Sequence, residues 1–413
     1  MGKFNNIKQT PLVKPIGSDA FGRITVAQPQ TLFDSKLLHD KMPLFWDEQI
    51  TNTSGNATST HSTTNSSVTM HVETGDVIIR QTKTHWNYQP GKAQECYYTA
   101  ELVAAAEGNG VKARIGSFTD TDGLFLEYDS GVIYVVERKA TVDIRVAQAE
   151  WNMDKLDGSN GETNPSGYTL NPTRVQILYL DYEWLGVGTV RYGFFIDGEL
   201  HIVHETHHAN VAGQTTVYMS TPNLPVRYEL RSAVASVDMQ QICSSVVSNG
   251  GLQGNGVIHS VENSPTGILA NVADTIYAAI GIRLKSTHLD AQVQPIGNSF
   301  LIETADNIQW LLMVNPTIAG TFTYNDVTNS ACQVAYGATA NVVTDDSWDA
   351  LVDSGYVIAS GTGNNARGTG GGLLNLTLYL GSQIDGTPDE FVLAVRPFSG
   401  AAAVQAALTY QEL

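Results

Sequence analysis

Residues 123–148 read GLFLEYDSGVIYVVERKATVDIRVAQ, and this stretch indicates the fold class most directly. It contains three short runs rich in aromatic, aliphatic and β-branched residues, which favour strands. The dipeptide Ser130-Gly131 separates the first two runs, as expected of a hairpin turn that needs positive φ. The stretch therefore predicts neighbouring antiparallel strands.

Similar runs recur at short intervals on both sides of this stretch. VKARIGSF at 111–118 and PVRYELRS at 225–232 are examples before and after it, and TIYAAIGIRLK at 275–285 and FVLAVRPF at 391–398 continue the pattern. Turn residues bound the runs, and no short-period repeat is present. The whole chain therefore reads as all-β, with the rhythm of antiparallel sandwiches.

The length predicts two domains, because single hydrophobic cores rarely grow beyond about 250–300 residues. The Gly/Ser/Asn-rich run SSVVSNGGLQGNG at 244–256 resembles a linker. We therefore expect an extended N-terminal arm over 1–30, a first β-sandwich over 31–243, a linker over 244–258 and a second β-sandwich over 259–413.

Composition narrows the classes of partner. The chain has 23 Lys and Arg against 41 Asp and Glu, a net charge of −18, and it lacks the basic clusters that grip nucleic acid. The three cysteines, Cys96, Cys243 and Cys332, are too few and too scattered for a disulfide framework. No secretory h-region and no long apolar run is present, so we expect synthesis in a cytoplasm and no membrane insertion.

One stretch matches the H-E-x-x-H pattern of zinc proteases, from His204 to His208. In such enzymes the two outer histidines share a helix face. Here they sit in a strand-like run, where residues four apart are separated by about 13 Å, too far for one zinc ion. We therefore interpret the residues as a histidine cluster on the surface.

Pairs of acids two residues apart occur at Glu127/Asp129 and at Asp181/Glu183. On a strand each pair shares a face, at a spacing of about 6–7 Å that suits glycoside hydrolysis. Alternating acids are also typical of a solvated strand face. The hydrolase interpretation remains an alternative, and no catalytic residue is assigned.

Two acidic loops offer oxygen ligands for calcium, one at 120–123 and one at 154–160. In the second, the candidate ligands are Asp154, Asp157 and Asn160. Neither loop completes a twelve-residue calcium loop, and Asp-Gly is also a common turn dipeptide. Structural calcium therefore stands beside a plain turn as an alternative, and no other cofactor is expected.

Three aromatic residues are candidate contacts for a glycan, namely Trp151, Trp184 and Tyr192. Their rings could stack on sugars, although aromatic residues in strands more often belong to the core.

Several longer strings in the first half resemble a family of structural proteins encoded by tailed phages and other large DNA viruses. They are FGRITVAQPQTLFDSK (21–36), DVIIRQTKTHWNYQPGKAQE (76–95), VKARIGSFTDTDGLFLEYDSG (111–131), AEWNMDKLDG (149–158), DYEWLGVGTVRYGF (181–194) and YMSTPNLPVRYEL (218–230). The first domain is similar to concanavalin-A-like lectin sandwiches, which implies a jelly-roll architecture. The resemblance implies no catalytic residues.

The expected function is that of a non-enzymatic structural protein of the virion, as an exterior decoration, a fibre or a tail-associated component. Its expected partners are other virion proteins and copies of itself, with a trimer preferred by analogy. The alternatives are a lectin-like adhesin for a host surface glycan and, less favoured, a glycoside hydrolase.

Overall fold

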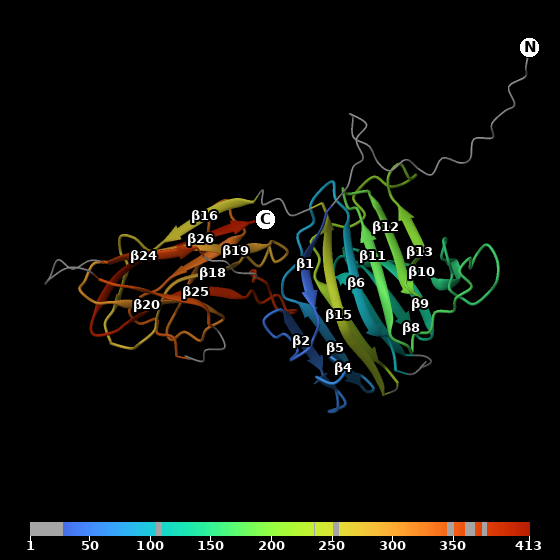
Figure 1. Ribbon diagram of the computed structural model, residues 1–413, viewed down its shortest axis with the longest axis horizontal. Helices are drawn as coiled ribbons and strands as arrows, with labels where there is room; N and C mark the ends of the chain where they lie inside the picture. Colours follow the sequence, from blue (N-terminus) through green and yellow to red (C-terminus); the bar gives the residue numbers. More distant parts are fainter. Residues whose placement is uncertain are drawn as a thin grey trace, which may run out of the picture.

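The structure is a computed structural model that describes residues 28–104, 110–234, 236–250, 256–344, 351–359, 368–373 and 378–413. Strands and loops make up nearly all of these residues, and the one helical element among them is a single 3-10 turn, η1 (Gln148–Glu150). Two antiparallel β-sandwiches of jelly-roll type lie side by side along the long axis (Figure 1). The predicted all-β class is therefore confirmed, while the predicted arm falls largely on residues 1–27, outside the described ranges.

The first sandwich contains an eight-stranded sheet and a seven-stranded sheet. The eight-stranded sheet has the order β13-β12-β11-β6-β15-β4-β3, with β1 also paired to β15. Its strands are β1 (Pro29–Ser35), β3 (Thr58–Ser62), β4 (Ser67–Val72), β6 (Gln94–Glu101), β11 (Gln176–Tyr182), β12 (Thr189–Ile196), β13 (Glu199–His207) and β15 (Val237–Asn249).

The seven-stranded sheet has the order β10-β9-β8-β7-β14-β5-β2. Its strands are β2 (Trp46–Thr51), β5 (Val77–Thr82), β7 (Val111–Phe118), β8 (Gly123–Asp129), β9 (Val132–Lys139), β10 (Val142–Ala147) and β14 (Val226–Ser232). The stretch 123–148 thus forms a meander of three strands at one edge of this sheet, as its pattern predicts.

The second sandwich pairs a five-stranded sheet with a six-stranded sheet, in the orders β16-β26-β19-β24, with β17 also on β26, and β21-β22-β18-β25-β20-β23. Its strands are β16 (Val257–Glu262), β17 (Ile268–Ala270), β18 (Tyr277–Leu284), β19 (Val293–Ile302), β20 (Ile308–Val314), β21 (Tyr324–Asp326), β22 (Cys332–Tyr336), β23 (Leu351–Val357), β24 (Gly368–Leu373), β25 (Glu390–Pro397) and β26 (Ala402–Glu412).

The two sandwiches have separate hydrophobic cores. The burial pattern of most strands fits a sandwich, in which one face of each sheet is buried. In β6 and β26 buried residues alternate with half-buried ones, because successive side chains point to opposite faces. β8 differs, because almost all of its residues are buried on both faces, including Glu127. Some structure must therefore cover the outer face of the seven-stranded sheet.

Two predicted boundaries are wrong by a few residues. β15 runs to Asn249, so the first six residues of the predicted 244–258 linker belong to a strand. Val246 and its neighbours form part of β15 rather than a flexible linker, because β15 pairs with β1 on one side and with β6 on the other. β1 begins at Pro29, so the end of the predicted 1–30 arm belongs to the same sheet, and β16 begins at Val257.

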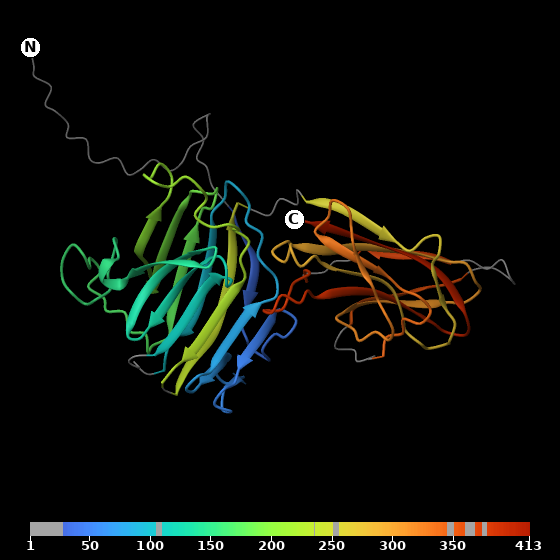
Figure 2. The ribbon, with the colours of Figure 1, turned by 180° about the vertical axis from the view of Figure 1, so that it is seen from behind.

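The two sandwiches contact each other through the segment that precedes β25. Figure 2 shows this segment reaching the first sandwich beside β2. The backbone N–H of Ser382 donates to the carbonyl of Lys83 at 2.9 Å, and the N–H of Ile384 donates to the Asp47 carboxylate at 2.8 Å. Phe45 packs against both cores. Hydrogen bonds in addition to apolar packing therefore hold the sandwiches together.

A second set of bonds joins the loop after β18 to the first sandwich. Asp290 accepts a hydrogen bond from the Thr221 hydroxyl at 2.8 Å and, through its carbonyl, one from the Asn223 amide at 3.1 Å. These bonds involve a different loop of the second sandwich from the one that contacts Lys83, so two loops join the sandwiches.

Gly381 allows the close approach at Lys83. An added Cβ would lie 2.5 Å from the Lys83 carbonyl oxygen, so any side chain must push the two sandwiches apart. We expect Gly381→Ala to lower the free energy of unfolding by about 1–3 kcal/mol and to increase the radius of gyration. Scanning calorimetry and small-angle X-ray scattering measure the two effects.

Gly400→Ala is the matched control, because a Cβ there would meet no atom within 4 Å. If Gly381→Ala and Gly400→Ala both match the parent chain, the Lys83 contact does not hold the sandwiches together.

Candidate functional site

The outer face of the seven-stranded sheet carries a network of ion pairs, which we call the arginine network. Its members are Lys112, Arg114, Glu127, Asp129, Arg145, Arg227, Glu229 and Arg231. On β14 the side chains of Arg227, Glu229 and Arg231 point to this face, because they alternate with the core residues Tyr228 and Leu230. The register places Glu229 opposite Arg114 of β7. Strand pairing therefore brings together charges that lie far apart in the sequence.

Glu229 lies at the centre of the arginine network. Its carboxylate accepts hydrogen bonds from Arg114 at 3.1 Å, Arg227 at 3.1 Å and Arg231 at 3.0 Å. Burial alone raises the pKa of Glu229, but the three guanidinium groups outweigh burial and lower this pKa to about 2. Glu229 is therefore ionised at neutral pH.

A second carboxylate of the network, Glu127, is held in the same way. Its carboxylate forms ion pairs with Arg114 Nε at 2.6 Å and with Arg145 at 2.5 Å, and the Lys112 ammonium lies 3.7 Å away. Asp129, its partner in the predicted acid pair, binds Lys112 and Arg145 at 3.0 and 2.7 Å. Both carboxylates of this pair are thus neutralised by basic side chains.

Arginines also cover the aromatic rings on this face. Arg138 lies over Phe125 at 4.9 Å from the ring centroid, and Arg227 lies over Phe118 at 5.1 Å. Arg145 lies over Tyr134 at 3.9 Å. These cation–π contacts occupy the ring faces on which a sugar would otherwise stack. The arginine network is the structure that buries β8 on its outer side.

This arrangement does not suit glycoside hydrolysis. The reaction needs one carboxylic acid that can give a proton to the leaving group and a second carboxylate that is free to attack or to activate water. Glu229 cannot hold a proton near neutral pH, and Glu127 has both oxygens paired. The carboxylates of the network therefore act as structural counterions.

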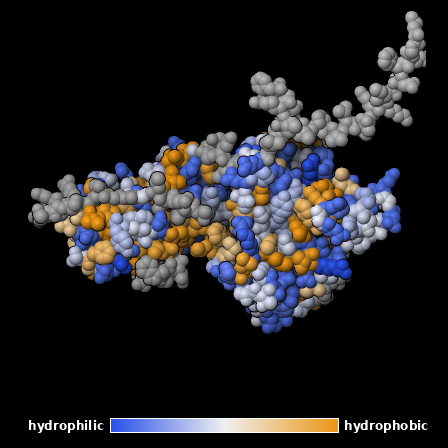
Figure 3. Space-filling view, in the orientation of Figure 1, coloured by the Kyte–Doolittle hydropathy of each residue, from blue (hydrophilic) through white to orange (hydrophobic). Residues whose placement is uncertain are grey.

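The other predicted acid pair, Asp181/Glu183, belongs to β11 and the loop that follows it. Burial raises the pKa of Asp181 to about 6. Asp181 lies beside the aromatic residues Tyr97 and Tyr179, whose ring centroids are 5.4 Å apart. Hydrophobic residues lie over the neighbouring strands β12 and β13 among hydrophilic ones (Figure 3). Glu183 is exposed in the loop, so the pair does not converge on one point.

The zinc interpretation of residues 204–208 fails in the structure, as the sequence context predicts. His204 lies on strand β13 and accepts a hydrogen bond from the backbone of Asn152 at 3.3 Å. His208 instead binds the Glu137 carboxylate at 3.0 Å and the Gly188 carbonyl at 2.8 Å. Both histidines are buried rather than exposed, which corrects the predicted surface cluster.

The calcium candidates serve as turn-forming groups. The Asp154 carboxylate accepts hydrogen bonds from two backbone N–H groups, at 3.1 and 3.2 Å, and Asp157 accepts one at 2.9 Å. Asn160 is exposed. Within the described ranges, no group of three or more His, Cys, Asp or Glu side chains is arranged to hold a metal ion. The hydrogen bonds of Asp154 and Asp157 fit a plain turn, and calcium at this loop stays a prediction.

Two of the three predicted glycan contacts are wrong, because Trp151 and Tyr192 lie in the core of the first sandwich. The Tyr192 hydroxyl donates to the carbonyl of Val136 at 2.8 Å, so even its polar end is satisfied internally. Trp184 is partly exposed, although its indole N–H donates to the carbonyl of Met219 at 3.1 Å. Of the three rings, Trp184 alone reaches the surface.

A pocket of about 450 Å³ lies between the two sandwiches, next to the arginine network. Strands β5 and β14 and the turn between β7 and β8 form its wall in the first sandwich. The loops 286–290 and 382–386 form its wall in the second. Arg227 connects the pocket to the arginine network, because it binds both Asp120 in the pocket and Glu229 in the network.

Two buried nitrogen atoms in the lining lack a hydrogen-bond partner, Arg227 Nε and His85 Nδ1. Arg227 is 2% exposed and His85 is 6% exposed. Burial lowers the pKa of His85 to about 4, so its ring is neutral at pH 7. Sequence reasoning missed this site, because its residues come from five separate segments and match no motif.

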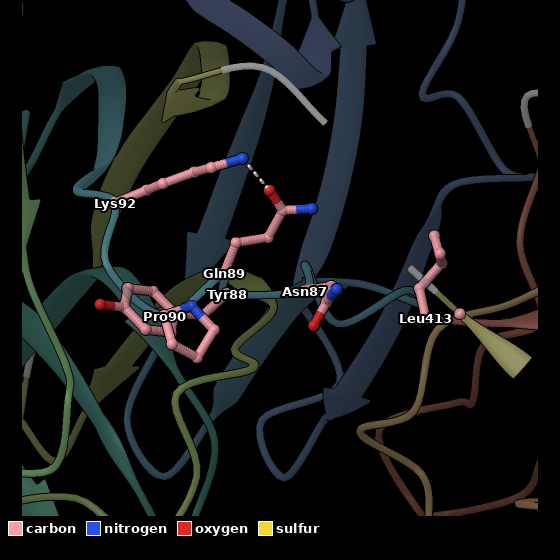
Figure 4. A pocket seen from close by; sticks show the side chains of 7 residues that line it. Asn87, Tyr88, Gln89, Pro90, Lys92 and Leu413 are labelled. Atoms are coloured by element: carbon pink, nitrogen blue, oxygen red, sulfur yellow. Dashed lines mark hydrogen bonds between the residues drawn. The ribbon is translucent and has the colours of Figure 1, made fainter. Parts of the chain in front are cut away.

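A smaller cleft of about 270 Å³ lies at another point between the sandwiches. Figure 4 shows it between the loop 87–92 and the last residue, Leu413, with Lys92 hydrogen-bonded to Gln89. The buried Tyr88 hydroxyl of this cleft has no hydrogen-bond partner. The larger pocket is the stronger candidate, because it has the greater volume and two unpartnered buried nitrogen atoms.

Comparisons with known proteins give only distant structural likenesses. No protein family and no curated protein matches the sequence. Among solved structures, the carbohydrate recognition domain of Emp47p is 9% identical, with a TM-score of 0.35 over 57% of this chain and 100% of that chain. A β-glucanase of Bacillus licheniformis is 7% identical, with a TM-score of 0.32 over 56% of this chain and 100% of that chain.

A third solved structure is the CBM2 module of an evolved Dit protein from Lactobacillus casei BL23 phage J-1. It is 8% identical, with a TM-score of 0.34 over 55% of this chain and 100% of that chain. At these identities and TM-scores, the likenesses say nothing about what this chain binds or where it acts.

The arginine network makes a prediction about pH and stability. The pKa of Glu229 falls from 4.5 in the unfolded chain to about 2 in the folded one. The stabilisation is therefore complete above pH 4.5 and is lost as the pH falls toward 2, with a total of about 3 kcal/mol. At neutral pH we expect Glu229→Gln to lower the free energy of unfolding by about 3–5 kcal/mol, because the arginines lose their counterion.

Denaturant titrations of both proteins at several pH values measure this effect. The difference between them should be constant above pH 5 and shrink as the pH falls. The control, Glu150→Gln, changes an exposed residue and should leave stability unchanged. A difference between Glu229→Gln and the parent chain that grows on acidification would show that Glu229 is not held ionised.

Proposed function

We propose that the protein is a non-enzymatic structural component of a viral particle, placed on its exterior. One structural observation carries the non-enzymatic part: the acids on the open face of the seven-stranded sheet are neutralised by arginine and lysine side chains. Glu229 and Glu127 each bind two or more basic groups. An active site would leave at least one such carboxylate free.

The viral placement rests on the sequence resemblance of residues 21–230 to structural proteins of tailed phages and large DNA viruses. The rigid contact between two sandwiches supports it, because Asp290 and Ser382 fix the second sandwich on the first as one building block. The net charge of −18 fits a surface that faces outward rather than toward a genome. The proposed partners are other virion proteins and further copies of this chain, with which it forms a trimer.

The second candidate function is that of a glycan-binding adhesin on the same particle. The pocket between the sandwiches favours it, because most of its lining residues carry hydroxyl, amide or carboxylate groups. The two functions are compatible, since an exterior subunit can also bind a host surface.

Purified particles of the virus that encodes the chain should contain it. We expect mass spectrometry to detect the chain and immunogold electron microscopy, with antibody against the second sandwich, to label the particle. Labelling over the head indicates a decoration protein, and labelling confined to the tail indicates a fibre or adhesin. Absence of both the label and the peptides from the particles overturns the structural role.

A further inference from the structure

We propose that the pocket between the two sandwiches binds a neutral, polyhydroxylated ligand, such as an uncharged sugar residue of a glycan. The inference rests on the second candidate function and names its site and its ligand class. The pocket lies beside the outer face of the seven-stranded sheet, which the arginine network covers.

The pocket has the size of a ligand site. Its volume of about 450 Å³ falls within the range of about 300–1,000 Å³ that is usual for small-molecule pockets. Its lining mixes apolar surface, to which Leu289 and Ile384 contribute, with hydroxyl-bearing residues such as Thr119, Thr221 and Thr287. A mixed lining of this kind suits a sugar, which carries hydroxyl groups on an apolar carbon ring.

Buried groups in the lining offer unused hydrogen-bonding capacity. Arg227 Nε is a donor without a partner, and His85 Nδ1 donates or accepts according to its tautomer. Both atoms are buried from water, so a ligand reaches them only if the side chains turn toward it. A sugar hydroxyl both donates and accepts, so it suits either nitrogen. It can also donate to the Asp120 carboxylate at the rim.

The charge balance of the lining selects against ions. Arg227 is the one guanidinium group, and it already faces Asp120 and Glu229. Asp290 adds a second carboxylate to the pocket, and His85 is neutral. A phosphate, sulfate or sialic acid group would thus meet carboxylates without a free cation to pair with. An uncharged ligand avoids this desolvation cost.

The walls are held in place before any ligand arrives. In the wall from the second sandwich, the Ser382 and Ile384 backbone bonds fix one loop, and the Asp290 bonds to Thr221 and Asn223 fix the other. Preorganised groups lose little entropy on binding. The lining contains no Phe, Tyr or Trp ring, so each single site should bind weakly, and several copies on one particle would add avidity.

The test uses the full chain, with saturation-transfer NMR and a glycan array that carries neutral glycans and their sialylated and sulfated counterparts. Ser286→Trp places a large ring at an exposed position in the pocket wall, and Gln383→Ala removes a lining amide. We expect each to weaken binding of neutral glycans by about tenfold or more. Tyr97→Ala, on the outer face of the eight-stranded sheet, is the control and should bind like the parent chain.

Three results would overturn the proposal in distinguishable ways. Neutral glycan binding that survives both pocket variants places the site elsewhere and leaves the adhesin function standing, most clearly if Tyr97→Ala abolishes it. Binding confined to sialylated or sulfated glycans refutes the neutral ligand class. Absence of binding to any glycan refutes both the pocket proposal and the adhesin function, whereas the structural role is decided separately by the particles.

Discussion

The buried carboxylate of Glu229, shared among three arginines, is the interaction on which the first sandwich and its surroundings depend. A carboxylate with so little access to water is tolerated only when its charge is paired and hydrogen-bonded. Arg114 extends the pairing to Glu127 on β8, and Arg227 extends it to Asp120 at the pocket. One network therefore spans strands β8, β7 and β14 and ends where the second sandwich begins.

The arginine network also explains what the open face of the first sandwich does not do. In a sandwich of this type an exposed sheet face with aromatic rings is a natural platform for a sugar. Here arginines lie over Phe118, Phe125 and Tyr134, and both acids of the central row are neutralised. The proposed binding site lies instead near the start of β14, where Arg227 Nε and His85 Nδ1 remain unpaired. The stabilising network and the candidate site thus share one residue, Arg227.

The contact between the sandwiches gives the second half of the chain a role in that site. Gly381 permits a backbone approach that no side chain would allow, and the following residues, 382–386, become a wall of the pocket. Neither sandwich alone forms the pocket.

The described part of the chain contains no helix with the length and apolar character to cross a membrane.

The sequence by itself determined the fold class, because short runs of aromatic, aliphatic and β-branched residues separated by turn residues, such as those in 123–148, favour antiparallel strands. It also determined the turns, since dipeptides such as Ser130-Gly131 adopt positive φ at both residues.

Tertiary structure alone decided the site. Arg114 and Glu229 are 115 positions apart, and only strand register makes them partners. Burial of Trp151 and Tyr192 likewise follows from the packing of two sheets, which local patterns do not encode. The pocket exists because loops from distant parts of the chain meet across an interface, and no single segment carries a signal of that meeting.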